Sequence, residues 1–429
     1  MIYQLNLQEK LKSYTSEYEP LFKNRNLIML VFAGIISSFG SKITYFALLR
    51  KVYTITGGKI ASLGALSVFE ILPSIIFGAV AGFIIDRISR KWSMVVSDIL
   101  SGVTILTVIF IQDIKLIYLI AFLNASVNVF RIPAQRAFEP NLVEKENIPL
   151  LNSFNSFANN FTQIVGAATG AAIVGFVGVN TAFIIDALTF WTSAIIITTI
   201  RAKELHLEER GKQIKAKAVG LKQSFKEVSK EFVEGSSIMW HEKSVKLMVF
   251  IDLYFTFAMT MQGVLIYYFI KETLKMGDKA ELAWGILLSS LGVGALIGSL
   301  ILGVVVKRYK KRFKLFLNAL MFDAVVFTIF LLNKYFPLSI VLFALLGIIS
   351  SAYMIILYSV IQNAVPDENR GKVFGVLSML KSPIGILSVT VGTAAATLIS
   401  AQGVLLLAAA IEASISIGVR FTKTYRDVE

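Results

Sequence analysis

Nine ionisable side chains fall inside long apolar stretches of this chain, and they are the residues that most directly suggest chemistry. They are Lys42, Glu70, Asp98, Arg131, Asp186, Asp252, Asp323, Lys381 and Glu412. A charge placed in hydrocarbon costs roughly 2.5–3.5 kcal/mol or more, so such residues usually form ion pairs, relay protons or border a polar cavity. Each of the nine is therefore a candidate functional residue.

Depth within the apolar stretch separates these candidates. Glu70 and Lys381 each lie ten residues from the end of their stretch, which places them about 15 Å into a core of about 30 Å. Asp323 and Glu412 are also deep. Three others lie within about two helical turns of one end, where they could form gate pairs or reach water, and a structural role is favoured for them: Asp98, Arg131 and Asp252.

A second set of polar side chains follows one face of the fifth apolar stretch, residues 151–177. They recur at helical spacing: Asn152, Ser156, Asn159, Asn160 and Gln163. A polar face on a membrane helix usually borders a cavity or another helix. Together with Met259 and Gln262 from residues 245–270, these side chains predict a cavity suited to a bulky amphiphile. Core packing accounts for the methionine about as well.

Twelve apolar segments must hold these side chains in place. The chain has 429 residues, of which 55% are hydrophobic and 16% are charged, and its mean hydropathy is +0.70. A soluble chain carries about a quarter charged residues, and a spanning helix needs roughly 20 mostly apolar ones. We predict an all-α membrane protein with spans at 26–49, 60–85, 93–112, 115–135, 151–177, 180–200, 245–270, 282–306, 313–333, 337–361, 371–397 and 403–421.

Composition also limits the chemistry. The chain has no cysteine, which excludes disulfides and thiolate metal sites, and its two histidines, His206 and His241, both lie in one polar loop. No metal or other cofactor is therefore expected. There is no Gly-x-x-x-x-Gly-Lys-Ser/Thr loop for a nucleoside triphosphate. We expect neither an enzyme nor an ATP-driven pump.

The basic residues are unevenly distributed along the chain. The net charge is +14, and if both termini are cytoplasmic, 31 of the 42 lysines and arginines lie on cytoplasmic segments. This asymmetry follows the positive-inside rule and predicts both termini inside the cell. The basic surplus then lies beside anionic membrane lipids, and nucleic-acid binding is not expected.

The longest polar stretch divides the spans into two sets of six. Its second half has apolar side chains on one helical face, which predicts an amphipathic helix or a mere connector. We expect an amphipathic N-terminal segment, a first six-helix domain, a cytoplasmic linker, a second six-helix domain and a cytoplasmic tail, at 1–25, 26–200, 201–244, 245–421 and 422–429.

A charged loop follows the second span, and a similar basic loop occurs about half the chain length later. It runs from Gly82 through Asp86, Arg87 and Arg90 to Lys91, and a basic loop beginning at Gly303 follows the eighth span. The first loop resembles motif A of the major facilitator superfamily of secondary transporters. Further matches, among them Ser38-Phe39-Gly40, the run from Phe183 to Phe190 and the run from Arg370 to Gly375, are similar to the drug-proton antiporters that include macrolide-efflux proteins and siderophore exporters.

The resemblance implies a fold and roles for named residues. The fold has twelve transmembrane helices in two pseudo-symmetric six-helix domains, and the motif A residues Gly82, Asp86, Arg87, Arg90 and Lys91 would hold the cytoplasmic side closed. The second and eleventh spans face each other in this fold, which favours a Glu70–Lys381 ion pair across the interface and makes Glu70 the leading proton carrier. Asp323 and Glu412, the other deep acids, lie on spans that this fold places at the periphery. Asp186 lies near the outer end of the sixth span, which this fold places on the outside of its domain, so an architectural role is expected for it.

Three departures from the family pattern bear on the mechanism. Ser89 stands where motif A has a second glycine, and Ala167 stands where the antiporter motif has a proline. Lys42 follows Ser41 where many relatives carry an acid. Ser89 would affect gating, Ala167 would affect the bend of the fifth span, and Lys42 would affect proton coupling.

The function implied by the resemblance is export of amphipathic small molecules, as in multidrug or macrolide efflux. Alternating access coupled to protons would drive it, in the cytoplasmic membrane of a bacterium, with the transporter acting as a monomer. A lysophospholipid or other lipid transporter of the same fold is the alternative. A membrane scaffold or sensor that transports nothing is a third reading, which the deep charges argue against.

The topology can be tested directly because the chain contains no cysteine. A cysteine introduced by Lys217→Cys lies in the predicted cytoplasmic linker, so a membrane-impermeant maleimide should label it only after the cells are opened. Labelling of intact cells would contradict the predicted topology.

Overall fold

The computed structural model describes residues 19–85, 87–201, 221–308, 311–422 and 425. Twelve of its helices are long and apolar enough to span a membrane, which confirms the predicted all-α class. The N-terminal domain contains α3 (Arg25–Ile55), α4 (Ile60–Ile85), α5 (Arg90–Val108), α6 (Ile114–Phe138), α7 (Ile148–Val177) and α8 (Val179–Thr199). The C-terminal domain contains α11 (Lys243–Tyr268), α12 (Ala280–Arg308), α13 (Arg312–Leu332), α14 (Phe336–Ala364), α15 (Asp367–Ile399) and α16 (Ala401–Gly418).

Shorter elements complete the chain. The helix α2 (Glu19–Lys23) precedes α3, and α10 (Leu221–His241) precedes α11. The expected amphipathic N-terminal segment and the first part of the linker lie largely outside the described residues. α10 packs against α15, where the Lys372 ammonium lies 2.7 Å from the Glu234 carboxylate. This hydrogen bond and the charge of Lys372 lower the pKa of Glu234. The contact attaches α10 to the C-terminal domain.

Local sequence explains several helix ends. The Asn24 side chain accepts a hydrogen bond from the Leu27 amide at 3.1 Å, and Asp113 accepts one from Lys115 at 2.8 Å. Ser89, the first departure from motif A, caps α5 by accepting a hydrogen bond from the Trp92 amide at 3.1 Å. Serine therefore replaces the glycine with a residue that satisfies one of the free amides at the start of the helix.

Glycines allow the closest helix contacts. A Cβ built on Gly294 of α12 would lie 1.9 Å from the Ala344 carbonyl oxygen of α14. One built on Gly170 of α7 would lie 2.9 Å from the backbone of Lys42 in α3. Because lipid supplies little hydrophobic drive between helices, such close backbone approach is a main source of their packing energy.

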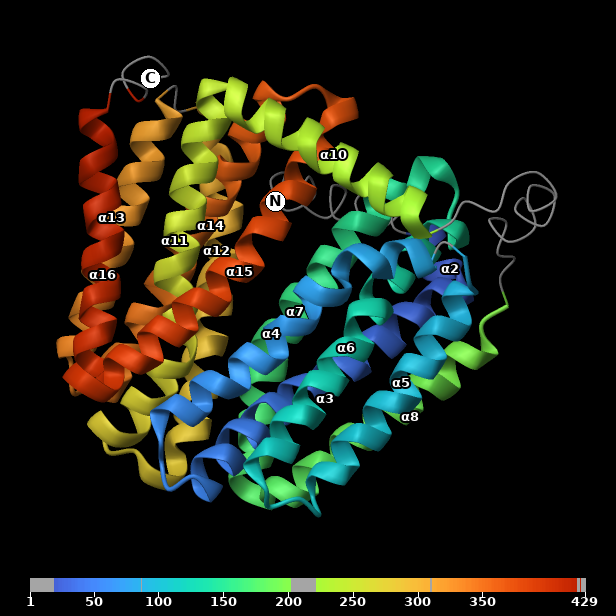
Figure 1. Ribbon diagram of the computed structural model, residues 1–429, viewed down its shortest axis with the longest axis horizontal. Helices are drawn as coiled ribbons and strands as arrows, with labels where there is room; N and C mark the ends of the chain where they lie inside the picture. The colour runs from blue at the N-terminus through green and yellow to red at the C-terminus, as the bar shows by residue number, and fades with distance from the viewer. Residues whose placement is uncertain (1–18, 86, 202–220, 309–310, 423–424, 426–429) are drawn as a thin grey trace, which may run out of the picture.

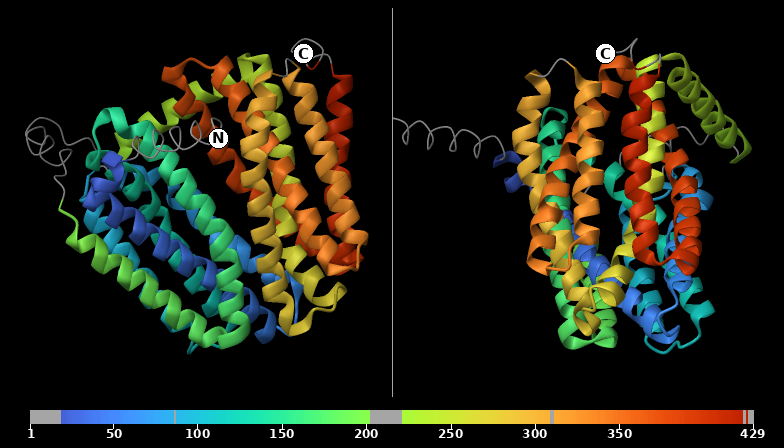
Figure 2. Two further views of the ribbon diagram at one scale, coloured as in Figure 1. Left: turned by 180° about the vertical axis from the view of Figure 1, so that it is seen from behind. Right: turned by 90° about the vertical axis from the view of Figure 1, so that its left-hand side faces the viewer.

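The two domains touch at one end and diverge at the other. Figures 1 and 2 show both bundles converging away from α10 and separating toward the end that carries α2 and α10. The domains meet along α4 with α15 and along α7 with α12. The close contacts begin near the end opposite α10, where Gly64 meets Thr393 and Gly285 meets Ala171. They continue inward as far as Ser74 with Ser382 and Ser289 with Ile164. We call the touching end the closed end.

The α12–α14 contact generates a stability prediction. Gly294→Ala places a methyl group against backbone that cannot rotate away, so α12 and α14 must separate, at a cost of about 1–3 kcal/mol. The melting temperature of the purified protein in detergent should fall. Gly175→Ala in α7 is the matched control, because a Cβ there meets no atom within 4 Å, and an equal fall in both variants would contradict the packing role.

Candidate functional site

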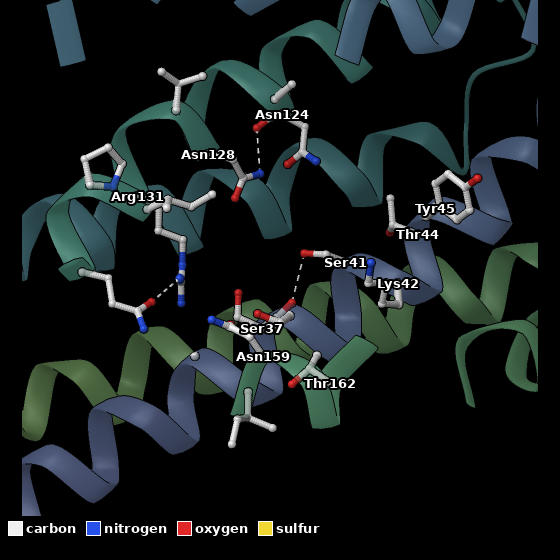
Figure 3. A pocket seen from close by; sticks show the side chains of 18 of the residues that line it. Ser37, Ser41, Lys42, Thr44, Tyr45, Asn124, Asn128, Arg131, Asn159 and Thr162 are labelled. Atoms are coloured by element: carbon white, nitrogen blue, oxygen red, sulfur yellow. Dashed lines mark hydrogen bonds between the residues drawn. The ribbon is translucent and has the colours of Figure 1, made fainter. Parts of the chain in front are cut away.

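A polar cavity of about 1090 Å³ lies along the N-terminal domain. Its walls come from α3, α4, α6 and α7, with Asp186 of α8, and the C-terminal domain adds only Ser378 of α15. Figure 3 shows side chains of α3, α6 and α7 pointing into one space, among them Ser41, Asn128 and Asn159. Hydroxyls and neutral amides alternate there with apolar side chains such as Val31, which gives the wall both hydrogen-bonding and apolar surface.

Two charged side chains deep in this cavity have no partner in the described part of the chain. Glu70 of α4 and Lys42 of α3 both line it, and neither forms a hydrogen bond or an ion pair there. Tyr45, one turn after Lys42, also lines the cavity, and its hydroxyl oxygen accepts a hydrogen bond from Trp284 Nε1 of α12 at 3.4 Å. This bond links the cavity wall to the opposite domain.

Lys381 has a different partner from the one predicted. α4 and α15 do face each other, and Ser74 Oγ lies 3.4 Å from Ser382 Oγ across the interface. The Lys381 ammonium, however, lies 2.7 Å from the carboxylate of Asp252 on α11, and Tyr353 donates a hydrogen bond to the same carboxylate. The predicted Glu70–Lys381 pair is therefore not formed in this structure. The reason is that Lys381 points to α11 within its own domain.

A hydrogen-bonded chain joins four helices at the α10 end of the cavity. Arg131 binds Asp98 with Nε to Oδ1 at 2.5 Å, and Ser193 donates to Asp98 at 2.6 Å. Arg131 also donates to Gln135 at 2.9 Å, as Figure 3 shows. Beyond this, Glu139 accepts hydrogen bonds from Gln135 at 2.8 Å and from Asn155 at 2.7 Å. The Asp98 side chain is fully buried, so the pair is a structural link with Arg131 facing the cavity.

Asp186 of α8 is also held by specific partners. Asp186 accepts hydrogen bonds from Thr44 and Thr189, and a Cβ at Gly40 would lie 2.0 Å from its oxygen. These contacts tie α3 to α8.

In the C-terminal domain, Asp323 of α13 and Glu412 of α16 are both buried, on helices that pack against each other. Gln262 donates to Glu412 at 2.7 Å.

The predicted substrate residues divide into two groups. Asn159 and Gln163 line the cavity, whereas Asn152 and Asn160 are exposed and are not part of its wall. The side chain of Ser156 lies outside the described residues. Gln262 is buried against Glu412, and Met259 packs on the core of the C-terminal domain.

The motif A residues bind backbone carbonyls where they are described. Arg90 donates to the carbonyl of Ala137 at 2.8 Å, and Lys91 donates to Thr198 at 2.8 Å and Ile200 at 2.7 Å. Arg87 follows the end of α4, and Gly82 lies within it. Asp86 lies outside the described residues. The basic residues thus hold the ends of α6 and α8 together.

A cluster at the closed end was not anticipated from the sequence. The Tyr53 hydroxyl of α3 donates to Glu272, and the Lys271 ammonium lies 4.3 Å from the centre of the Tyr53 ring. Arg50 lies 3.7 Å from Asp278. Lys271 also contacts Glu281 at 3.4 Å, and Tyr267 donates to Glu281 at 2.5 Å. These residues lie near loops of opposite domains. The only sequence signal for the cluster is that basic and acidic residues occur in both of these loop regions. We call Arg50, Tyr53, Lys271, Glu272 and Asp278 the closed-end cluster.

Comparison with solved structures places this geometry among known transporters. The nucleoside transporter NupG has a TM-score of 0.66 at 14% identity, covering 92% of this chain and 98% of that one. A bacterial homologue of the iron transporter ferroportin in the inward-facing state has a TM-score of 0.67 at 12% identity, covering 91% of this chain and 98% of that one. At such low identity the similarity concerns the fold alone.

Sequence comparison gives the family. Multidrug efflux pump Tap of Mycolicibacterium fortuitum is 26% identical over 381 residues, covering 85% of this chain and 88% of Tap. Macrolide efflux protein A of Streptococcus pyogenes is 23% identical over 368 residues, covering 83% and 87%. The model of the Major Facilitator Superfamily matches residues 30–417. The predicted family and drug-efflux resemblance are confirmed, and the chain belongs to the major facilitator superfamily of transporters.

Proposed function

We propose that this protein exports amphipathic small molecules from a bacterial cell by proton-coupled alternating access. The observation that carries the proposal is the cavity of about 1090 Å³, lined by neutral amides, hydroxyls and apolar groups and shut off by domain contacts at the closed end. A site of this size and mixed character suits an amphiphile better than a sugar or a small ion. The names of the efflux relatives support the same substrate class.

The charge distribution supports the direction of loading. The helix α2, the C-terminal end of α16 and α10 lie at the diverging end (Figure 1), and the positive-inside asymmetry of the basic residues supports a cytoplasmic location for that end. The cavity would then take substrate from the cytoplasm or the inner leaflet. Breaking the closed-end cluster while the α10 ends approach each other would expose the same cavity to the outside.

Glu70 is the proposed proton carrier. It is an acid of the cavity wall with no hydrogen bond or ion pair in the described ranges, so both of its protonation states are available to solvent or substrate. A cationic group of a substrate would bind the carboxylate and exclude the proton, and a proton would exclude the cation. Mutually exclusive binding at one group is sufficient to couple the two movements.

The role of Glu70 can be tested in inverted membrane vesicles. Glu70→Gln keeps the size and polarity of the side chain but cannot exchange a proton, so accumulation of a radiolabelled macrolide or of ethidium under a pH gradient should fall at least tenfold. Glu144→Gln changes an exposed acid and should leave the rate unchanged. Normal accumulation by the Glu70→Gln variant would remove Glu70 as the carrier and make Asp323 and Glu412 the next candidates.

The closed-end cluster makes a prediction about conformation. Tyr53→Ala removes both the hydrogen bond to Glu272 and the ring beneath Lys271, together worth about 1–3 kcal/mol. The population that is open at this end should rise by roughly 5- to 150-fold. Spin labels attached through Lys59→Cys and Lys334→Cys, which lie on exposed turns of the two domains, should report longer distances. Thr54→Val, a neighbour that bonds only to its own helix, is the control, and unchanged distances in Tyr53→Ala would refute the gating role.

A further inference from the structure

The Lys42 side chain is built into the cavity wall. Its stem packs against α7, where a Cβ at Gly166 would lie 3.2 Å from Lys42 Cγ. The backbones of α3 and α7 are in close contact at Gly170, which fixes the root of the side chain. The ammonium group nevertheless has no hydrogen bond or ion pair with any described residue. A cation held at this depth without a partner is costly.

Most of the other intramembrane charges have partners, which makes this arrangement informative. Arg131 is paired with Asp98 and Lys381 with Asp252, and Asp186 is held by two threonines. Arg136, a further cavity cation, lies in the last turn of α6 near the membrane surface. Lys42 and Glu70 remain as the two unpartnered charges deep in the cavity, and no ion pair joins them.

Domain movement would not bring Lys42 and Glu70 together. α3 and α4 belong to the same six-helix domain and pack against each other, so a rocking motion carries both as one body. The C-terminal domain offers only Ser378 to the cavity. In this conformation, the counter-charges of Lys42 and of the ionised Glu70 must therefore come from something that enters the cavity.

We propose that the substrates of this transporter are zwitterionic amphiphiles, whose acidic group binds Lys42 and whose cationic group binds Glu70. The inference rests on the proposed function of the cavity as the substrate site. Asn124, Asn159 and Gln163 offer hydrogen bonds to the polar headgroup, and Val31, Ile35 and Ile132 offer apolar surface to the chain. Lys42 is then a specificity-determining residue, standing where many relatives carry an acid.

This arrangement is consistent with proton exchange. A purely anionic amphiphile would bind Lys42 best when Glu70 is protonated, so substrate and proton would move together. A zwitterion needs the ionised Glu70 carboxylate for its cationic group, so substrate and proton exclude each other. Lys42 and Glu70 therefore select zwitterionic substrates, and for such substrates export from the cell is linked to proton entry.

Thermal stabilisation of the purified protein in dodecyl maltoside tests the proposal. The probes share one octyl chain: octylphosphocholine and N-octyl betaine as zwitterions, octyltrimethylammonium as the cation and octyl phosphate as the anion. At alkaline pH, both zwitterions should bind wild-type protein about tenfold or more tightly than either singly charged probe, as expected for one additional contact between opposite charges. Partition of a given probe into micelles is the same for every variant, so it cancels when the affinity ratio of two probes is compared between variants.

Variants identify the group responsible. Lys42→Gln should abolish the advantage of the zwitterions over the cation, and Lys42→Arg should retain it. Glu70→Gln should abolish their advantage over the anion. Lys59→Gln, on an exposed turn, should change nothing. The preferred zwitterion identifies its source, since phosphocholine is a lipid headgroup and betaine resembles an amino acid.

An unchanged ratio of zwitterion to cation affinity in Lys42→Gln would overturn the proposal, as would equal binding of all four probes to wild-type protein. The measurement uses no gradient and no vesicles. Failure of proton-driven export would therefore leave the binding ratios intact, and failure of the ratios would leave export intact.

Discussion

In a bilayer every buried polar group must find its partner inside the protein, and the rest of this structure depends on that constraint. Helices satisfy their own backbones, and intramembrane charges such as Asp98 and Lys381 are matched by partners on neighbouring helices. The buried Glu412 carboxyl group accepts a hydrogen bond from Gln262 of α11. Against this background an unmatched charge stands out, and the cavity wall holds two, Lys42 and Glu70.

The same constraint shapes the interface between the domains. In its inner part, small residues such as Gly64 and Gly285 bring the helices together with few polar contacts. Charged and aromatic side chains lie at the outer edge of the interface, where Arg50 and Tyr53 contact the opposite domain. When these contacts break, water can solvate the groups on both domains. An interface built this way can separate without leaving charges in lipid, because the groups that lose partners are those nearest to solvent.

The sequence predicted the elements well but not the choice of partner. Span positions follow from apolar length, and the depth of Glu70 or Lys381 follows from counting residues. Which neighbour each side chain meets depends on the rotation of its helix, and that rotation is set by packing. Lys381 thus turned to Asp252 instead of Glu70. Gln262 binds Glu412 and does not line the cavity. Glu139 and Asn155 are part of the hydrogen-bonded chain at the cavity, although nothing in the sequence around them predicted this. Only part of the polar stripe, Asn159 and Gln163, reaches the cavity, because the stripe covers more of the helix surface than the cavity does.

The cavity belongs almost wholly to one half of the chain, with Ser378 as the single contribution of the other. In evolutionary terms, the proposed function would place selectivity mainly in the first half of the gene. Substitutions in the first half can change what is recognised while the second half keeps its own core and its linker helix attached through Glu234 and Lys372. Recombination at the linker would then exchange whole recognition modules between related genes, and a bacterial population could acquire a new export spectrum in one genetic step.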